Sequence, residues 1–385
     1  MKTLADRLRS PDGGGNPGLS DPCLAGGLLA VLGCLAPLYP QLIHFGFAFF
    51  FRSTLFLLLG LLGYRFGLAE VARRIVTSPL FWPALLFLVL LSVELVQTPN
   101  VYRAKAKISL LLAAGLIYSL AFVWPWNERA RQWVCWGLLI GGVGAALHAL
   151  YTQWTGHGAL IATIKTNPIY PADMREEMIR SLQANRALGR FGNPNHLAGY
   201  LVLCLWPLWI LGKAQANRRQ RMLLLAAGGI LVWGIYRTYS RSGLIALAVT
   251  AALFAGYELH ARGFRFTWKS ALGTALSMLI LGAGFFTLLP EQWLGGRLMT
   301  VSTIVARIHF FRGGVAIIQD HPWLGVGPEG FEGHYCAYLR PGDLESRYVH
   351  NVLLETGVEG GIAGVFLFFW LLIVTFLSLS RAQRR

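Results

Sequence analysis

The feature that most constrains this chain is a series of apolar segments, each long enough to cross the hydrocarbon layer of a membrane as a helix. Such a crossing takes ~20 predominantly apolar residues. Across all 385 residues, 55% are hydrophobic and only 14% are charged. A soluble domain of this length needs more charge on its surface. The sequence therefore predicts an all-α polytopic membrane protein, and it excludes a disordered chain, a secreted disulfide scaffold and an ordinary cytosolic enzyme.

About ten transmembrane helices are predicted. The candidate spans are residues 23–39, 43–63, 79–97, 106–125, 133–154, 194–212, 221–238, 243–260, 270–289 and 351–379. The first is followed by further spans, so we interpret it as a retained helix rather than a cleaved signal peptide. The predicted organisation is a tail of residues 1–22, a transmembrane domain of residues 23–380 and a C-terminal tail of residues 381–385.

Basic residues in the connecting segments predict the orientation, because cytoplasmic loops carry an excess of Lys and Arg. With the N-terminus inside, the inner segments hold 18 of these residues and the short outer loops hold five. Both termini are therefore predicted to be cytoplasmic. Two larger loops, about residues 155–192 and 291–350, then face outward, and the second is predicted to be partly helical. The same rule explains the net charge of +16 without nucleic acid as a partner.

Neither a disulfide framework nor a metal site is predicted. The five cysteines are an odd number, four of them lie in apolar stretches, and no CxxC pair occurs. The outer loops contain no carboxylate cluster of the kind that binds a divalent cation. We therefore expect no metal and no cofactor.

The stretch Arg190-Phe-Gly-Asn-Pro-Asn195 predicts the start of a membrane helix at the outer face. Asn193 is a good N-cap, and Pro194 suits the first helical position. The free N–H groups at a helix N-terminus favour a phosphate, and Arg190 adds a cation with a forked set of donors. The alternative is a plain helix cap, with Arg190 on lipid headgroups.

A similar arrangement, Tyr239-Ser-Arg-Ser-Gly243, begins the eighth predicted span. Ser240 or Ser242 can cap the helix, and Arg237 and Arg241 flank the turn. By the predicted topology, the sixth, eighth and tenth spans all begin at the outer face. Three positive helix ends with nearby arginines predict a cradle for a diphosphate. Taken alone, this motif can also be a serine-rich cap near headgroups.

The second outer loop carries further basic candidates. Arg307 and Arg312 lie in a stretch with partly helical spacing, and Arg347 lies near the end of the loop. The pair Gly325-Val-Gly327 has no βαβ context, so a tight turn is favoured over a nucleotide-binding loop.

His350 stands where this loop re-enters the membrane. A neutral imidazole there can take a proton from a sugar hydroxyl, because the reference pKa of histidine is close to neutral pH. A histidine that hydrogen-bonds headgroups or backbone is the alternative. Glu355 and Glu359 lie inside the last span, where a carboxylate needs a partner, so either can pair with an arginine or orient the histidine. Arg52 and Glu94 are also predicted to be intramembrane, and they are functional candidates for the same reason.

Four of these stretches, in this order and spacing across residues 186–365, resemble motifs of the O-antigen ligase and O-antigen polymerase superfamily of bacterial envelope glycosyltransferases. They read Arg190-Phe-Gly-Asn-Pro-Asn195-His-Leu-Ala, Tyr239-Ser-Arg-Ser-Gly243, Asp320-His-Pro-Trp-Leu-Gly-Val-Gly-Pro328 and His350-Asn-Val-Leu-Leu-Glu-Thr-Gly-Val-Glu-Gly360. The first 155 residues match only as generic membrane helices.

The resemblance implies a metal-independent, inverting transferase in the bacterial inner membrane, with its active site at the periplasmic face. The implied donor is an undecaprenyl-diphosphate-linked glycan, and the acceptor is lipid A core or another glycan. His350 is then the general base, and Arg307, also catalytic, helps to hold the diphosphate. The other residues implied in binding the diphosphate are Arg190, Asn193, Asn195, Arg241, Arg312 and Arg347. The supporting residues are Ser240, Asn351 and Glu355.

Ligation to lipid A core is favoured within this family, because one large loop, rather than two, carries the histidines and arginines. An O-antigen or exopolysaccharide polymerase and a protein O-oligosaccharyltransferase remain alternatives with the same donor. A transporter of a polyprenyl-linked or anionic substrate is the alternative from another class. It needs a midplane site, often with inverted repeats, and the sequence has no such repeat.

Overall fold

The computed structural model describes most of the chain from residue 60 onward. The described residues are 60, 62, 64, 66–124, 126–166, 175–176, 179, 182–183, 185–214, 217–263, 301–341 and 343–383. The predicted spans 23–39 and 270–289 and Arg52 lie outside them, and the span 43–63 is described only at residues 60 and 62. Within the described residues all regular structure is helical, which confirms the predicted all-α class.

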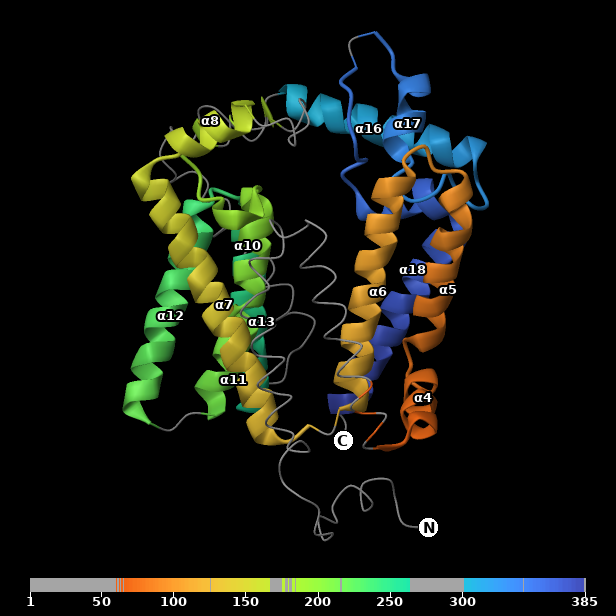
Figure 1. The fold of residues 1–385 in the computed structure, drawn as a ribbon. Helices are drawn as coiled ribbons and strands as arrows, with labels where there is room; N and C mark the ends of the chain where they lie inside the picture. The colour runs from red at the N-terminus through yellow and green to blue at the C-terminus, as the bar shows by residue number, and fades with distance from the viewer. Residues whose placement is uncertain are drawn as a thin grey trace. The chain divides into compact units, whose positions relative to one another are not determined.

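The chain forms two compact units. Among the described residues, the first unit holds residues 126–263, and the second unit holds residues 60–124 and 301–383. The helices of the first unit are α7 (Glu128–Thr155), α8 (Gly158–Thr166), α10 (Pro194–Leu203), α11 (Leu205–Ala214), α12 (Arg218–Arg237) and α13 (Arg241–Ala261), with the short 3₁₀-helix η3 (Gly189–Phe191) before α10. Figure 1 labels these helices along the chain.

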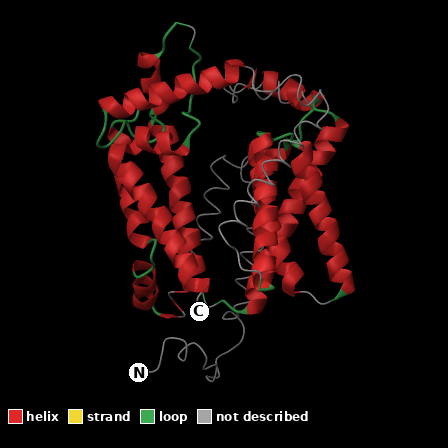
Figure 2. Ribbon diagram, turned by 180° about the vertical axis from the view of Figure 1, so that it is seen from behind, coloured by secondary structure: helices red, strands yellow, loops and turns green. Residues whose placement is uncertain are grey.

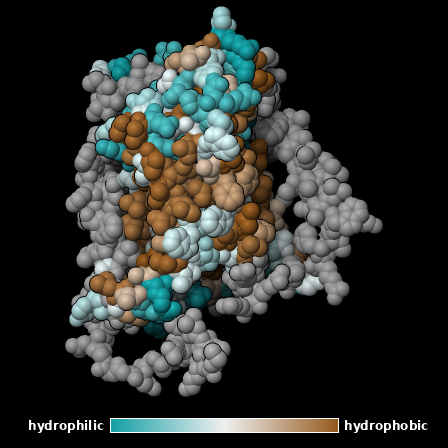
Figure 3. All heavy atoms as spheres, turned by 90° about the vertical axis from the view of Figure 1, so that its right-hand side faces the viewer, coloured by the Kyte–Doolittle hydropathy of each residue, from teal (hydrophilic) through white to brown (hydrophobic). Residues whose placement is uncertain are grey.

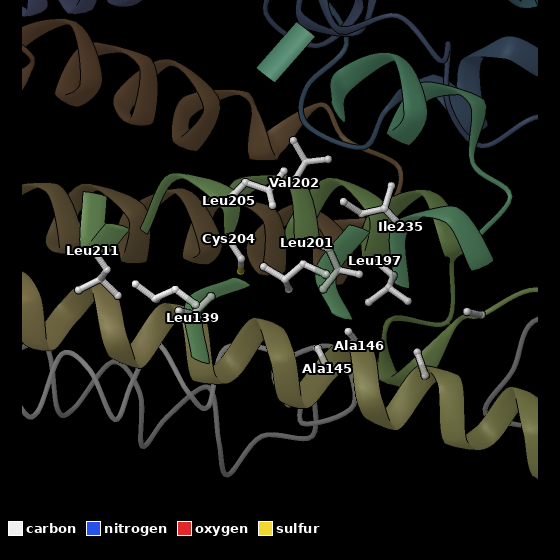
Figure 4. Close-up of a cluster of buried hydrophobic side chains, with 14 residues drawn as sticks. Leu139, Ala145, Ala146, Leu197, Leu201, Val202, Cys204, Leu205, Leu211 and Ile235 are labelled. Atoms are coloured by element: carbon white, nitrogen blue, oxygen red, sulfur yellow. The ribbon is translucent and has the colours of Figure 1, made fainter. Parts of the chain in front are cut away.

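Small residues let the helices of the first unit pack closely around one apolar core. Figure 4 shows this core, to which α7, α10, α11 and α12 contribute side chains. A Cβ built on Gly142 would lie 2.6 Å from Sγ of Cys204, and one built on Gly234 would lie 3.0 Å from Cβ of Ala146. Any larger residue at Gly142 would push α7 and the α10–α11 pair apart. Cys204 lies at the break between α10 and α11 and is buried, as a small apolar side chain would be.

The second unit pairs membrane-length helices with helices that lie across their ends. Its elements are α4 (Leu68–Val76), α5 (Phe81–Val93), η2 (Glu94–Val96), α6 (Val101–Val123), α16 (Val301–Asp320), α17 (Phe331–Tyr335), η4 (Cys336–Tyr338) and α18 (Val352–Gln383). Helices α5, α6 and α18 run side by side, and α16 crosses one end of them (Figures 1 and 2). Helix α16 lies within residues 291–350, the segment predicted as the second outer loop.

Five described helices are long and apolar enough to span a membrane, or six if the bent pair of α4 with α5–η2 is one span. They are α6, α7, the α10–α11 pair, α13 and α18. Helix α12 is not among them because arginines at both of its ends shorten its apolar stretch. Exposed apolar side chains follow α5 and α18, and Figure 3 shows an apolar band between hydrophilic ends on this side of the second unit. This pattern suits a surface in contact with lipid.

Helix α18 is kinked at Gly361, where φ is 57° and ψ is −155°. The segment that follows α16 docks on this kink and takes over its interrupted hydrogen bonds. The N–H groups of Val326 and Gly327 donate to the carbonyls of Val358 and Glu359, and those of Ile362 and Ala363 donate to Pro322 and Trp323. Gly325 and Gly327 both have positive φ, and a Cβ on Gly325 would lie 2.4 Å from the carbonyl oxygen of Val358. The predicted tight turn is confirmed, and the glycines serve close backbone packing.

Candidate functional site

The first unit brings two helix N-termini together. Asn193 caps α10 by accepting a hydrogen bond of 2.8 Å from the N–H of Asn195, and Pro194 is the first helical residue. Ser240 caps α13 by accepting one of 3.1 Å from the N–H of Gly243. A Cβ built on Gly243 would lie 2.5 Å from Cβ of Ala198 in α10, so the two helices touch near their starts. Both predicted caps are therefore confirmed, and their positive helix ends are neighbours.

Four arginines surround these helix ends, and they divide into two kinds. Arg186 donates through Nε to the carbonyl of Thr238 at 2.8 Å, and Arg237 donates through Nε to the side-chain oxygen of Gln153 at 3.0 Å. These two brace the turn that leads into α13. Arg190 and Arg241 form no hydrogen bond or ion pair with another residue that the structure describes. Arg190 is exposed and Arg241 half-buried, so both guanidinium groups remain able to bind an anion.

In the second unit, His350 lies at the start of α18 with an exposed side chain and a left-handed backbone. Its φ of 60° is uncommon for a residue with a Cβ, and such strain persists where the surroundings enforce it. Its ring lies 5.7 Å from that of Phe310 on α16 and 6.4 Å from that of Tyr348, measured between centroids. Phe310 is buried, so α16 forms a fixed wall beside the imidazole.

Two supporting residues fix the backbone around His350. Asn351 caps α18, and its side-chain oxygen accepts from the N–H groups of Leu353 and Leu354 at 3.0 and 3.2 Å. Glu355, one turn into the helix, reaches back and accepts from the N–H of Val349 at 2.8 Å. The chain is thus held on both sides of His350. Glu355 acts on the backbone beside the histidine, and the structure places the positive end of α18 at the same point.

The arginines predicted in the second outer loop differ in their contacts. Arg307 is exposed on α16 and forms no hydrogen bond or ion pair with another described residue. Arg312, also on α16, donates through Nη2 to Oδ2 of Asp343 at 2.5 Å. Arg347 lies 3.4 Å from Oε2 of Glu329, and its guanidinium carbon is 5.1 Å from the ring centre of Tyr348. Arg307 is therefore the arginine of this group best placed to meet an anion without losing another contact.

Sequence reasoning missed two ion pairs that helix α6 forms with this part of the second unit. Lys107 on α6 contacts Oε1 of Glu359 at 2.5 Å and lies 3.9 Å from Oε1 of Glu329. Arg103, on the same helix, contacts Glu332 at 2.5 Å. The span predicted from residue 106 left Arg103 outside the helix, which was wrong. Helix α6 begins at Val101 because Asn100 caps it.

Glu94 is the other intramembrane acid that the sequence singled out. Its side chain is 1% exposed, and neither carboxylate oxygen has a hydrogen-bond partner among the described residues. The turn at Gly327 packs against its backbone, because a Cβ on that glycine would lie 2.6 Å from the Glu94 carbonyl oxygen. Among the residues that the structure describes, no group of three His, Cys, Asp or Glu is arranged to hold a metal ion.

The apolar helices and the polar ends define an integral membrane protein. The family model described as O-antigen ligase matches residues 223–369, and this match confirms the resemblance to the O-antigen ligase and polymerase superfamily. This family comprises membrane glycosyltransferase-like enzymes, both ligases and polymerases. Ser240, Arg241, Arg307 and His350 fall inside the matched segment, whereas the α10 cap lies before it. A search of the curated proteins found no match.

Proposed function

We propose that the protein transfers a glycan from undecaprenyl diphosphate to a sugar hydroxyl at the periplasmic face of the inner membrane, and that the acceptor is lipid A core. The observation that carries this proposal is the exposed, conformationally fixed His350 at the start of α18, within the segment that matches the O-antigen ligase model. Lipid-linked glycan and acceptor substrates are what the family implies.

In this proposal His350 is the general base. Its imidazole takes the proton of the acceptor hydroxyl while the hydroxyl oxygen attacks the anomeric carbon of the donor. The bond from that carbon to the diphosphate oxygen breaks, and the diphosphate leaves with the electron pair. One displacement inverts the anomeric centre. The proton on His350 then passes to water, so no metal is needed to balance the reaction.

The negative charge that develops on the leaving diphosphate needs cationic donors. Arg307 is proposed for this role in the second unit because its guanidinium is exposed and has no carboxylate partner among the described residues. In the first unit, we propose Arg190 and Arg241 as diphosphate ligands for the same reason. Asn193 and Asn195, at the start of α10, are proposed as ligands beside them. A diphosphate also suits the two adjoining helix N-termini of that unit.

Arg312 and Arg347 remain proposed diphosphate ligands of a different kind. Arg312 contacts the carboxylate of Asp343, and Arg347 contacts that of Glu329. Part of each guanidinium is therefore already occupied within the protein. A guanidinium has five N–H donors, and a single carboxylate contact leaves several for a phosphate. These carboxylates orient the two arginines but also offset their charge. We therefore expect each to contribute less to donor binding than Arg307 does.

A glycolipid gel tests the function. A deletion strain is complemented with the wild type, His350→Ala or Arg307→Ala, and the lipopolysaccharide and the carrier lipid are both examined. The proposal expects long glycan on lipid A core from the wild type only, with glycan accumulating on the undecaprenyl carrier in both variants. Core that carries one repeat without a ladder in the variants would instead identify a polymerase. A normal ladder from His350→Ala would contradict the base assignment and favour a transporter.

A further inference from the structure

Asp343 connects helix α16 with the loop between η4 and α18. Its side chain is only 3% exposed and lies in the loop between η4 and α18. Oδ1 lies 2.7 Å from Nδ1 of His309, and Oδ2 accepts hydrogen bonds from Nη2 of Arg312 at 2.5 Å and from the backbone N–H of Arg340 at 2.9 Å. One buried carboxylate thus meets two side chains of α16 and the backbone of its own loop.

The charge of this carboxylate is well supported. The backbone N–H of Arg340, followed by the positive charge of Arg312, holds the pKa of Asp343 below its usual value. The carboxylate is therefore ionised at neutral pH, and each of its oxygens has a partner. A buried charge with this many donors is costly to disturb, because loss of the charge leaves the donors without an acceptor.

The contacts of Asp343 also determine how α16 presents its basic side chains. His309 and Arg312 are three residues apart and share one face of the helix, which Asp343 binds. Phe310 lies on a neighbouring face and packs in the core next to His350. Asp343 and Phe310 together fix the rotation of α16. Asp343 accepts from one nitrogen of the Arg312 guanidinium. Because this group is planar and rigid, its remaining N–H donors then point in defined directions.

A groove lies beside these contacts. It is lined by Ile308, Phe311, Val315 and Ala316 together with Gln319, Arg312 and Arg340. Both arginines of the groove are tied to Asp343, one through its side chain and the other through its backbone. An apolar wall with one cation, Arg312, held by Asp343 and a second, exposed cation, Arg340, beside it suits a lipid that carries phosphate.

We propose that Asp343 is a positioning residue of the donor site, which acts through Arg312 and His309 to set the cations of α16 for a polyprenyl diphosphate. This inference rests on the proposed function. Asp343 itself does not touch the substrate, because its oxygens are occupied and buried. Its effect is therefore on donor binding rather than on proton abstraction.

The test measures binding of undecaprenyl diphosphate to the full-length protein in phosphatidylcholine nanodiscs. Asp343→Asn keeps an oxygen acceptor but loses the charge, and we expect about tenfold weaker binding. Arg312→Gln should weaken binding to a similar degree. The double variant should bind undecaprenyl diphosphate no more weakly than the single variant of lower affinity. Asp343→Glu, which restores the charge, should recover part of the affinity. Asp320→Asn is the matched control, because Asp320 ends α16 and bonds only to Tyr338 in the described residues.

Transfer kinetics provide the second readout. Asp343→Asn should raise the KM for the donor with little change in kcat or in the KM for the acceptor. A merely structural role would lower kcat with the fraction of folded protein and leave both KM values alone. Unchanged donor affinity in Asp343→Asn, or additive effects of the Asp343 and Arg312 variants, would overturn the inference.

The proposed function can fail separately. A wild type that binds undecaprenyl diphosphate but transfers no glycan would contradict the function and leave the binding test of Asp343 intact. A wild type that transfers glycan, with an Asp343→Asn variant of unchanged affinity, would contradict only the positioning role. A wild type that does not bind the probe would overturn both.

Discussion

The basic side chains around the candidate sites of the two units are held in different ways. In the first unit, Arg186 and Arg237 donate to a backbone carbonyl and to an amide side chain, which are neutral acceptors. In the second unit, Lys107, Arg312 and Arg347 each meet a carboxylate. Neutral acceptors hold an arginine without cancelling its charge, whereas a carboxylate holds and offsets it. The end of the first unit where α10 and α13 begin therefore stays positive, and the second unit gains rigidity around His350.

This comparison predicts that the buried ion pair is the contact most costly to break. Lys107→Ala leaves Glu359, with a side chain that is 6% exposed, without its cation, and should lower the free energy of unfolding by about 3 kcal/mol or more. The pair Lys213–Glu258 of the first unit is far more exposed, at 49% and 31%. Lys213→Ala should therefore cost less than about 1 kcal/mol. Reversible unfolding in sodium dodecyl sulfate measures both, and equal costs would contradict the contrast.

The turn that docks on α18 should be nearly as sensitive. Gly325 has a φ of 76°, and its substitution by Ala drives a Cβ into the backbone of Val358. We expect Gly325→Ala to destabilise the protein by about 3 kcal/mol through strain and overpacking. Gly115→Ala in α6 is the matched control, because nothing lies within 4 Å of a Cβ there. That variant should be neutral or slightly stabilising, since Ala favours helix. Thermal unfolding in detergent distinguishes the two.

Arg241 and Arg237 of the first unit test whether an arginine binds the anion or stabilises the fold. Arg241→Gln should weaken binding of undecaprenyl diphosphate about tenfold and leave the melting temperature unchanged. Arg237→Gln loses the contact with Gln153 and the stacking on Trp233 and Tyr239, so it should lower stability by about 1 kcal/mol. The reverse result, with Arg241 affecting stability and Arg237 affecting binding, would show that their roles are exchanged.

The smallest predicted effect is a difference in pH dependence. Burial lowers the pKa of His157 in the first unit from its ordinary value of 6.5. The folded state therefore resists protonation, and stability that is fully present above pH 6.5 is lost as the pH falls below it. Asp343 also has a lowered pKa, so its contribution is complete above 3.8 and is lost as the pH falls further.

Melting curves at a series of pH values separate these groups. His157→Gln should remove the part of the loss that begins just below neutral pH, and Asp343→Asn should flatten only the acid limb. A wild-type melting temperature that does not change between pH 7 and the acid limb would contradict the assignment to His157.

Local rules were sufficient for several features of the fold. The apolar runs predicted α7, α13 and α18 to within a few residues, because a membrane span needs a minimum length of apolar chain. The caps of α10 and α13 were predicted because Asn-Pro and Ser carry their helix-starting chemistry in adjacent residues. The same rules predicted where His350 would lie relative to the last helix.

Contacts between distant residues could not be predicted in this way. Arg103 and Lys107 find their carboxylates 229 and 252 residues further along the chain. Arg186 braces a turn 52 residues away, and Asp343 binds a helix that precedes it by 31 residues. No periodicity or motif records such pairs. The one available signal was a basic residue near a predicted span next to an intramembrane acid, as with Lys107 and Glu359.

The most direct test of the account compares glycan transfer and donor binding in the purified protein with His350→Gln. The predicted result is a transfer rate ~10²–10⁴-fold below the wild type with unchanged affinity for undecaprenyl diphosphate, because the variant loses the base and keeps the cations. His321→Gln, an exposed histidine of the same loop, should transfer at the wild-type rate. Wild-type transfer by His350→Gln would contradict the central claim.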